Sequence, residues 1–281
     1  MRGLVRAARV LVASAVTLAT GCGDSPGKAW LVDRTRVLGA RVEATTEPAR
    51  ASVDPGESAR ITWLVPSPQP SPLAWAYAAC VGASGQFASP RCAGPVLASG
   101  SGVNEGPPDE LAAMDLVVPP REAVADATEL LLLAAFCERA QAPTLDPQTF
   151  TGTCADGAEP LLASTRIRLG AAGRNENPAV ADDAARVPVD CVRPDGPEIV
   201  FGFRFDGRER EPGEAIVLSH VVTAGELDRA YSALEPDEAA PKEVTVPWRP
   251  PASEGDVKIH FVLRDGRGGT TFVQRTVCVR R

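Results

Sequence analysis

The sequence is short of the side chains on which most catalytic and metal sites depend. Its 281 residues include only two histidines. It contains no nucleophile elbow, phosphate loop or dinucleotide fingerprint. No two of its cysteines have the two-to-four-residue spacing of a zinc site. We therefore expect a non-enzymatic protein with no cofactor and no metal; a hydrolase of unrecognised type is the alternative that these absences leave open.

Aromatic residues and positive charge are also scarce. Aromatics make up 5% of the chain, which is thin for a sugar-stacking surface, and the formal net charge is −7. An acidic chain without a basic cluster argues against nucleic acid as a partner. Trp75 and Tyr77 are the tentative ligand contacts, for a glycan or a peptide. A core position is the other interpretation of Trp75, and burial of both rings would exclude a glycan platform.

Long hydrophobic runs are absent as well. A membrane-spanning helix needs about 20 apolar residues, and the most apolar stretch after the N-terminal region, Leu130–Phe136, has the length of a strand. The N-terminal run Val10–Leu18 is also too short. Three arginines precede it and small residues follow it, ending at Cys22. This is the arrangement of a secretory signal.

The end of that signal, Leu18-Ala19-Thr20-Gly21-Cys22, resembles a bacterial lipobox. In that family the signal peptidase cuts before the cysteine, whose thiol carries a diacylglycerol, and palmitate is a further acyl chain. The resemblance implies a signal peptide at 1–21, a lipid-attachment residue at Cys22 and a lipidated tether at 22–29. It also implies a lipoprotein of the bacterial cell envelope that is held at a membrane by the lipid on Cys22. The outer membrane is the favoured location. An ordinary cleaved signal with a chance cysteine is the alternative.

The remaining six cysteines form an even set, which in an exported chain indicates disulfides. Six cysteines allow 15 pairings. We expect Cys80–Cys92 and Cys137–Cys154 to close short loops inside one domain. The third pair, Cys191–Cys278, would then join the two ends of the other domain.

Short apolar-alternating runs separated by Pro- and Gly-rich turns predict an all-β fold. The first domain is expected at 30–169, with a strand at 128–137 buried on both faces and long disulfide-pinned loops at 81–106 and 138–160. A helix over 122–133 is the alternative to the first part of that strand and the residues before it. A Gly-rich, polar linker follows at 170–185.

The second domain is expected at 186–281. Ile199, Phe201, Phe203 and Phe205 recur at period two, and a hairpin surrounds residues 265–269. A short helical turn is expected within 225–234. The order of strands and turns resembles immunoglobulin-like modules, of the PKD and fibronectin kind. The resemblance implies two tandem immunoglobulin-like β-sandwich domains and no particular activity.

Neither histidine is predicted to bind metal. His260 should face outward because its strand neighbours alternate toward the core, and His220 lies on another strand. Paired acidic residues are interpreted as solvated loop charge, with a weak calcium site as the smaller alternative; they are Asp109/Glu110, Asp182/Asp183 and Glu235/Asp237/Glu238. We therefore expect a membrane-anchored interaction or structural module with an unknown protein or glycan partner in the envelope. A glycan- or peptide-binding accessory module is the second hypothesis.

Overall fold

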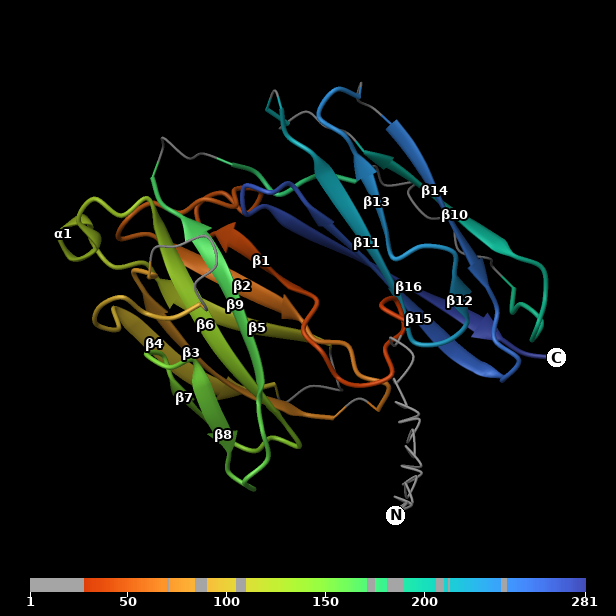
Figure 1. Cartoon of the computed structure of the whole chain (residues 1–281), viewed down its shortest axis with the longest axis horizontal. Coiled ribbons are helices and arrows are strands. Elements are labelled where there is room, and N and C mark those ends of the chain that lie inside the picture. The colour runs from red at the N-terminus through yellow and green to blue at the C-terminus, as the bar shows by residue number, and fades with distance from the viewer. Residues whose placement is uncertain are drawn as a thin grey trace, which may run out of the picture.

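The chain folds into two antiparallel β-sandwiches that lie side by side (Figure 1). The computed structural model describes residues 28–69, 71–83, 90–104, 110–170, 175–180, 190–205, 210–211, 213–238 and 242–281. Within these ranges the only helix is the single turn α1 (Arg121–Val124). The predicted all-β class is confirmed, and the chain forms two β-sandwiches. The expected signal at 1–21 and Cys22 lie outside the described residues.

The first sandwich consists of a three-stranded and a four-stranded sheet. The smaller has the order β1 (Gly39–Ala44), β2 (Ser58–Leu64), β5 (Leu111–Val117). The larger has the order β4 (Ala98–Val103), β3 (Leu73–Cys80), β6 (Glu129–Glu138), β9 (Leu161–Arg168). Their facing side chains form one core, in which the ring of Trp63 meets that of Phe136 edge-on at 5.6 Å. Trp63 is thus the central tryptophan of this sandwich.

Strand β6 is buried on both faces, as its unbroken apolar sequence predicts. Alternate residues enter the main core, while Leu131 and Leu133 join a small second cluster on the opposite face of the sheet. The hairpin β7 (Pro143–Asp146) and β8 (Thr151–Cys154) lies against that face, where Leu145 packs on the cluster. The expected loop at 138–160 therefore contains a hairpin that covers β6. The alternative helix at 122–133 is reduced to α1.

The sequence predicts a loop at 81–106, but these residues include strand β4. This strand escapes prediction because its small residues show no apolar alternation. Its glycines have a packing role. A Cβ at Gly102 would stand 2.5 Å from the ring of Trp75, and one at Gly100 would stand 2.7 Å from the ring of Tyr77. The same small residues that leave this strand without an apolar pattern give the two aromatic rings of β3 room to lie over it.

The second sandwich has the same two-sheet plan. One sheet has the order β10 (Ile199–Phe205), β14 (Lys242–Arg249), β12 (Glu226–Leu227). The other has the order β13 (Tyr231–Leu234), β11 (Ile216–Val222), β15 (Gly255–Arg264), β16 (Thr270–Val279). The predicted helical turn within 225–234 is wrong, because β12 and β13 each pair with a neighbouring strand there. Phe201, Phe203, Phe261 and Trp248 form the centre of a separate core.

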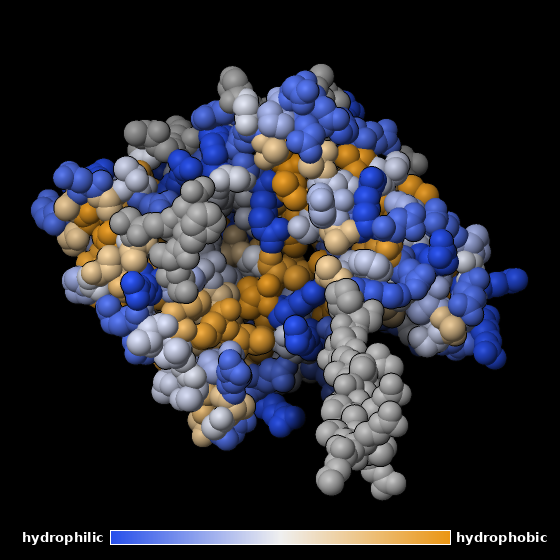
Figure 2. Space-filling view, in the orientation of Figure 1, coloured by the Kyte–Doolittle hydropathy of each residue, from blue (hydrophilic) through white to orange (hydrophobic). Residues whose placement is uncertain are grey.

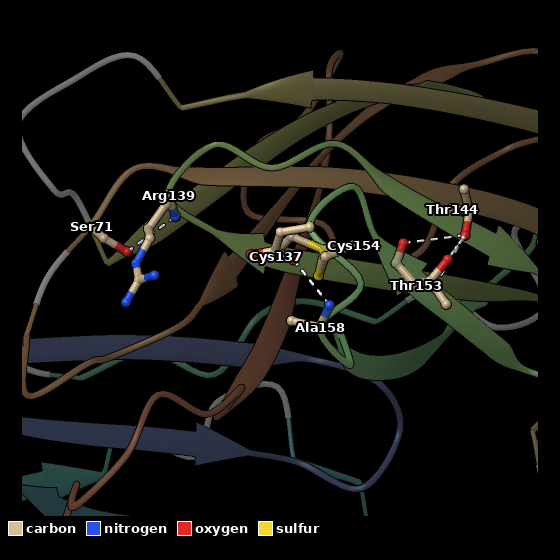
Figure 3. The surroundings of a disulfide bond; sticks show 8 residues. Ser71, Cys137, Arg139, Thr144, Thr153, Cys154 and Ala158 are labelled. Carbon is tan, nitrogen blue, oxygen red and sulfur yellow. Dashed lines mark hydrogen bonds between the residues drawn. A yellow bond between two sulfur atoms is a disulfide. The ribbon is translucent and has the colours of Figure 1, made fainter.

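Three disulfides join the cysteine pairs expected from the sequence. Cys80–Cys92 lies in the small cluster beside β6. Figure 3 shows Cys137–Cys154, which fastens β8 to the end of β6, with Thr144 and Thr153 joined by hydrogen bonds across the β7–β8 hairpin. Cys191–Cys278 joins the start of the second sandwich to β16. The two short loops are thus held to the sheet whose outer face they cover.

Residues 30–32 belong to the second sandwich, although the sequence places them in the first domain at 30–169. Leu31 forms a parallel bridge with Val222, and the backbone N–H of Val32 donates to the Val222 carbonyl at 2.8 Å. The side chains of Trp30 and Leu31 pack against the second core. The N-terminal segment therefore lies along the end of β11 before the chain crosses to form β1.

The expected linker is also a structural part of the junction. Asn175 and Asn177 are buried, and Glu176 bridges to Arg50. The Asn177 side chain donates to the Val42 carbonyl in the first sandwich at 2.8 Å. It also accepts from the Thr270 N–H in the second at 2.9 Å. Residues 175–180 thus fasten the two sandwiches together instead of merely separating them.

Candidate functional site

A hollow of about 660 Å³ opens between the two sheets of the first sandwich where it meets the second. One wall is the segment 34–40 leading into β1, and the other is the first half of β9, residues 161–165. Trp63 lies between these walls, and Arg264 and Thr270 come from the second sandwich. In Figure 2 apolar residues gather across the middle of the molecule with hydrophilic residues around them. We call this hollow the junction cleft.

The junction cleft contains a free strand edge. Strand β9 pairs with β6 on one side and is the last strand of its sheet. Its far end is closed, because the Arg168 carbonyl accepts from the Val53 N–H and the Gly170 N–H donates to the Val53 carbonyl, whereas the Leu169 N–H donates to Thr128 on the β6 side. Backbone groups of successive residues in an antiparallel strand point to opposite sides. Leu162 and Ser164 therefore direct their N–H and C=O groups away from β6.

The facing edge of β1 is already occupied. The Val42 carbonyl accepts from Asn177, and the Leu38 carbonyl accepts from the Arg264 guanidinium. The second sandwich and residues 175–180 thus occupy two carbonyls of this edge. Of the two strands beside the cleft, β9 leaves the longer run of backbone without a partner among the described residues.

The cleft is lined by cationic side chains. Arg34, Arg36 and Arg264 contribute to it, and no Asp or Glu is among its lining residues. Burial lowers the pKa of Arg264. Burial also lowers the pKa of Arg36; the nearby Asp33 charge opposes this effect, and the Arg34 charge adds to it. The Arg36 Nε and Nη2 atoms are buried and have no hydrogen-bond partner among the described residues. A negative group in the cleft would offset this desolvation cost.

Three ionisable residues meet next to this cleft at the sandwich junction. Glu110, expected as solvated loop charge, is 4% exposed. Its Oε1 lies 3.0 Å from Lys258 Nζ, and its Oε2 lies 3.4 Å from His260 Nε2. The prediction that His260 faces water is wrong: it points away from its own core, but the first sandwich covers that face and leaves it 0% exposed. Burial, then the charges of Lys258 and Arg36, lower the pKa of His260 to about 4.

A second buried carboxyl lies in the β15–β16 turn. Asp265 accepts hydrogen bonds from Asn175 Nδ2 at 2.5 Å and from the N–H groups of Arg267 and Gly269 at 2.8 and 2.9 Å. Burial raises its pKa, as does the nearby Glu214. A Cβ at position 269 would stand 2.2 Å from an Asp265 oxygen and 2.6 Å from the Glu176 carbonyl. The glycine therefore allows this turn to close onto residues 175–177.

His220 lies inside the second core. Its ring stands edge-on to Phe261 at 6.1 Å, and its Nδ1 lies 3.3 Å from the Arg229 carbonyl. Its Nε2 has no hydrogen-bond partner among the described residues. Burial lowers the pKa of His220 to about 4; the Arg229 carbonyl opposes this and the Arg229 charge adds to it. The two histidines thus lie on opposite faces of one sheet.

The tentative ligand contacts face the first core. Tyr77 is buried in it, and its hydroxyl donates to the Asp115 carbonyl at 3.0 Å. Trp75 is half-buried against the same cluster and stacks on Tyr77 at 6.1 Å. Because both rings lie on the core side of the sheet, over the glycines of β4, they do not form an outer stacking surface. The strand at β9 is predictable from its alternation, but sequence reasoning missed its free edge and its meeting with Arg36 and Arg264, since no local pattern shows that the fold brings them together.

The other acidic residues singled out from the sequence lie outside the junction cleft or outside the described residues. Glu235 and Asp237 are exposed, as expected for loop charge, and Glu238 pairs with Lys242 at 2.5 Å. Asp109, Asp182 and Asp183 lie outside the described residues. Within the described ranges, no three His, Cys, Asp or Glu side chains gather as a metal site would require. None of the helices described there has the length and apolar character needed to cross a membrane.

Comparison with known proteins gives similarity of architecture alone. No family model and no curated protein sequence matches the chain. Among solved structures, the red sea bream transglutaminase has a TM-score of 0.30 at 12% identity, over 88% of this chain and 31% of that one. The E. coli alpha-2-macroglobulin has a TM-score of 0.28 at 9% identity, over 87% and 17%. This chain therefore spans less than a third of either protein.

The D00-D0 domain of intimin is matched over its whole length. Its TM-score is 0.27 at 9% identity, and the match covers 86% of this chain and 100% of that one. At these values none of the three similarities assigns an activity, so the function must be argued from the junction cleft.

Proposed function

We propose that this chain is a non-enzymatic binding module of the bacterial cell envelope, anchored to the membrane by lipid on Cys22. It engages its ligand at the junction cleft. The observation that carries the proposal is the cleft itself: desolvated arginines line it, an unpaired strand edge borders it, and both sandwiches contribute to it. The backbone groups of β9 and the Arg36 guanidinium atoms in this hollow that lack partners among the described residues are suited to binding.

The fastening of the two sandwiches supports this role. Asn177 bonds to both, Asn175 bonds to Asp265, and Lys258 pairs with Glu110 across the junction. A cleft whose walls come from two domains keeps its shape only if the domains keep their positions. Preorganised walls lower the entropy cost of binding.

The membrane anchor is tested in the native host. Replacing Cys22 with alanine should move the protein from the membrane to the soluble fraction and abolish incorporation of labelled palmitate. One acyl chain gives only marginal attachment, whereas two or more hold a protein at a bilayer. If the Cys22→Ala protein stays in the membrane fraction, the anchor is refuted.

The binding role is tested by photo-crosslinking in the same cells. A photoreactive residue at Leu162, in the cleft, should give discrete crosslinked products. The same residue at Val200, which is exposed on β10 in the second sandwich, is the matched control. Products from Leu162 alone support the cleft as the binding site. No product at Leu162, or the same products from both positions, contradicts it.

A further inference from the structure

We propose that the ligand of the junction cleft is an extended protein segment carrying carboxylates, which adds as a strand to the free edge of β9. This deepens the proposed function and rests on it. The juxtaposition of an unpaired strand edge with uncompensated arginines in one hollow carries the inference. Strand addition supplies affinity through main-chain hydrogen bonds, and neighbouring side chains supply selectivity.

The strand edge determines the backbone of the ligand. Leu162 and Ser164 present two N–H and two C=O groups toward the open side of β9, between its start and the closure at Arg168. Leu161–Thr165 borders the cleft over five positions, and an added strand would follow them at about 3.4 Å per residue. Only an extended backbone places its own donors and acceptors at this repeat.

The charge of the cleft determines the side chains of the ligand. Arg36 and Arg264 have no ion pair with any described carboxylate, and Arg34 is exposed beside them. Carboxylates occur in the adjoining hollow near the β7–β8 hairpin, which contains Glu138, Asp156 and Glu159. Arg34 lines both hollows, whereas Arg36 and Arg264 are lining residues of the junction cleft and not of the other. An acidic side chain of the added strand would lie beside Arg36 and Arg264, where low-dielectric walls strengthen its attraction to the guanidiniums.

A strand of this kind would be selected by charge as well as by conformation. The apolar lining, with Val37, Leu38, Trp63 and Leu161 among its members, accepts aliphatic side chains. The arginines reject basic segments, because like charges in a partly buried hollow repel. The cleft thus favours a β-forming segment with alternate apolar residues and an acidic group, and disfavours the same segment with lysine.

The test is a titration of the full chain, purified in detergent, with two synthetic peptides. Each has about eight residues of alternating valine and threonine, enough to pair along β9. One carries a pair of glutamates and the other a pair of lysines at the same positions. Binding is followed by NMR, where the amide protons of Leu162 and Ser164 should move downfield and become protected from exchange. We expect the glutamate peptide to bind at least about tenfold more tightly than the lysine peptide.

Two variants separate the backbone from the charge contribution. Ser164→Pro removes an N–H that faces away from β6, so the sheet keeps its own hydrogen bonds while strand addition is blocked. Ser164→Ala keeps that N–H and is its matched control. Arg34→Glu should lower the affinity for the glutamate peptide by about tenfold. Arg60→Glu, on an exposed site of β2 outside the cleft lining, should not.

Each outcome decides the inference. Loss of binding in Ser164→Pro but not in Ser164→Ala, with preference for the glutamate peptide, supports it. Equal affinity for both peptides, undiminished binding to Ser164→Pro, or no binding of either peptide overturns it. The proposed function has its own readout. Crosslinks from Leu162 in cells together with failure of both peptides would remove the acidic strand and leave the cleft as a binding site.

Discussion

Lowering the pH from 7.5 to 5 should destabilise this protein mainly through His220 and His260. They are its only histidines, and both are 0% exposed. Burial is the main reason that the pKa of each is lowered from 6.5 to about 4. In the unfolded chain both rings bind a proton as the pH falls through 6.5, whereas in the folded chain they remain neutral until about pH 4. The unfolded state therefore gains protons first, and the free energy of unfolding falls across that window.

The magnitude follows from the two pKa values. At pH 5 a group that titrates at 6.5 when unfolded and about 4 when folded lowers the free energy of unfolding by about 2 kcal/mol. Two such groups give about 4 kcal/mol, a large share of the roughly 5–15 kcal/mol that stabilises an ordinary domain. Asp265 acts in the opposite direction. Burial raises its pKa in the folded chain, so the folded state binds a proton before the unfolded state as the pH falls, and this partly offsets the loss of stability.

Urea unfolding at pH 7.5 and pH 5 measures this difference. Wild type should lose about 4 kcal/mol between the two conditions, and His220→Gln or His260→Gln should lose about 2 kcal/mol each. The double variant should lose no stability over this range, because the remaining effect of Asp265 favours the folded state as the pH falls. Each variant is compared with itself, so a lower stability of the glutamine chain does not disturb the result. The reasoning is refuted if wild type has the same stability at both pH values, or if His220→Gln keeps the full pH dependence.

Three further substitutions test packing and the junction. Asn177→Ala should lower the free energy of unfolding by about 2–4 kcal/mol, because it leaves a buried carbonyl and a buried N–H without their partner; a loss no larger than that of an exposed substitution would contradict this. Gly102→Ala should cost about 1–3 kcal/mol in urea unfolding through its contact with a tryptophan ring, while Gly94→Ala, with open space around it, should cost much less. Replacing Cys191 and Cys278 together by serine should cost about 4–5 kcal/mol, since their disulfide closes the longest loop of the chain. An unchanged urea midpoint after that replacement would show that this loop closure contributes nothing.

The strands could be predicted where apolar side chains alternate in the sequence. The run at 199–205 and the hairpin around 265–269 occur in the structure as β10 and as β15 with β16. Strand β4 could not be predicted, since its alanine, serine and glycine residues contribute little apolar surface of their own. Its place is determined by Trp75 and Tyr77 on the neighbouring strand. Local patterns encode which face of a strand is apolar, and say less about strands that are shaped by a neighbour.

The junction could not be predicted for a related reason. Alternation correctly turns His260 away from Phe261 and its own core, but it does not tell whether water or a second domain lies on the other side. Glu110 and Asn177 have the polarity of exposed residues and become buried only because the two sandwiches meet. The candidate site was missed on the same grounds, because its walls are far apart in the sequence.

The crossing of residues 30–32 to the second sandwich determines how mechanical load enters the molecule. A pull on the chain from the N-terminal side of residue 28 meets the hydrogen bonds between Trp30–Val32 and Val222 before it reaches β1. Val222 lies within the covalent loop closed by Cys191–Cys278, so the second sandwich carries the tension and its extension is limited by that disulfide. The wall of the cleft at 34–40 lies beyond this point. The contacts of residues 30–32 with the second sandwich are therefore the first to bear such a pull, ahead of the cleft wall.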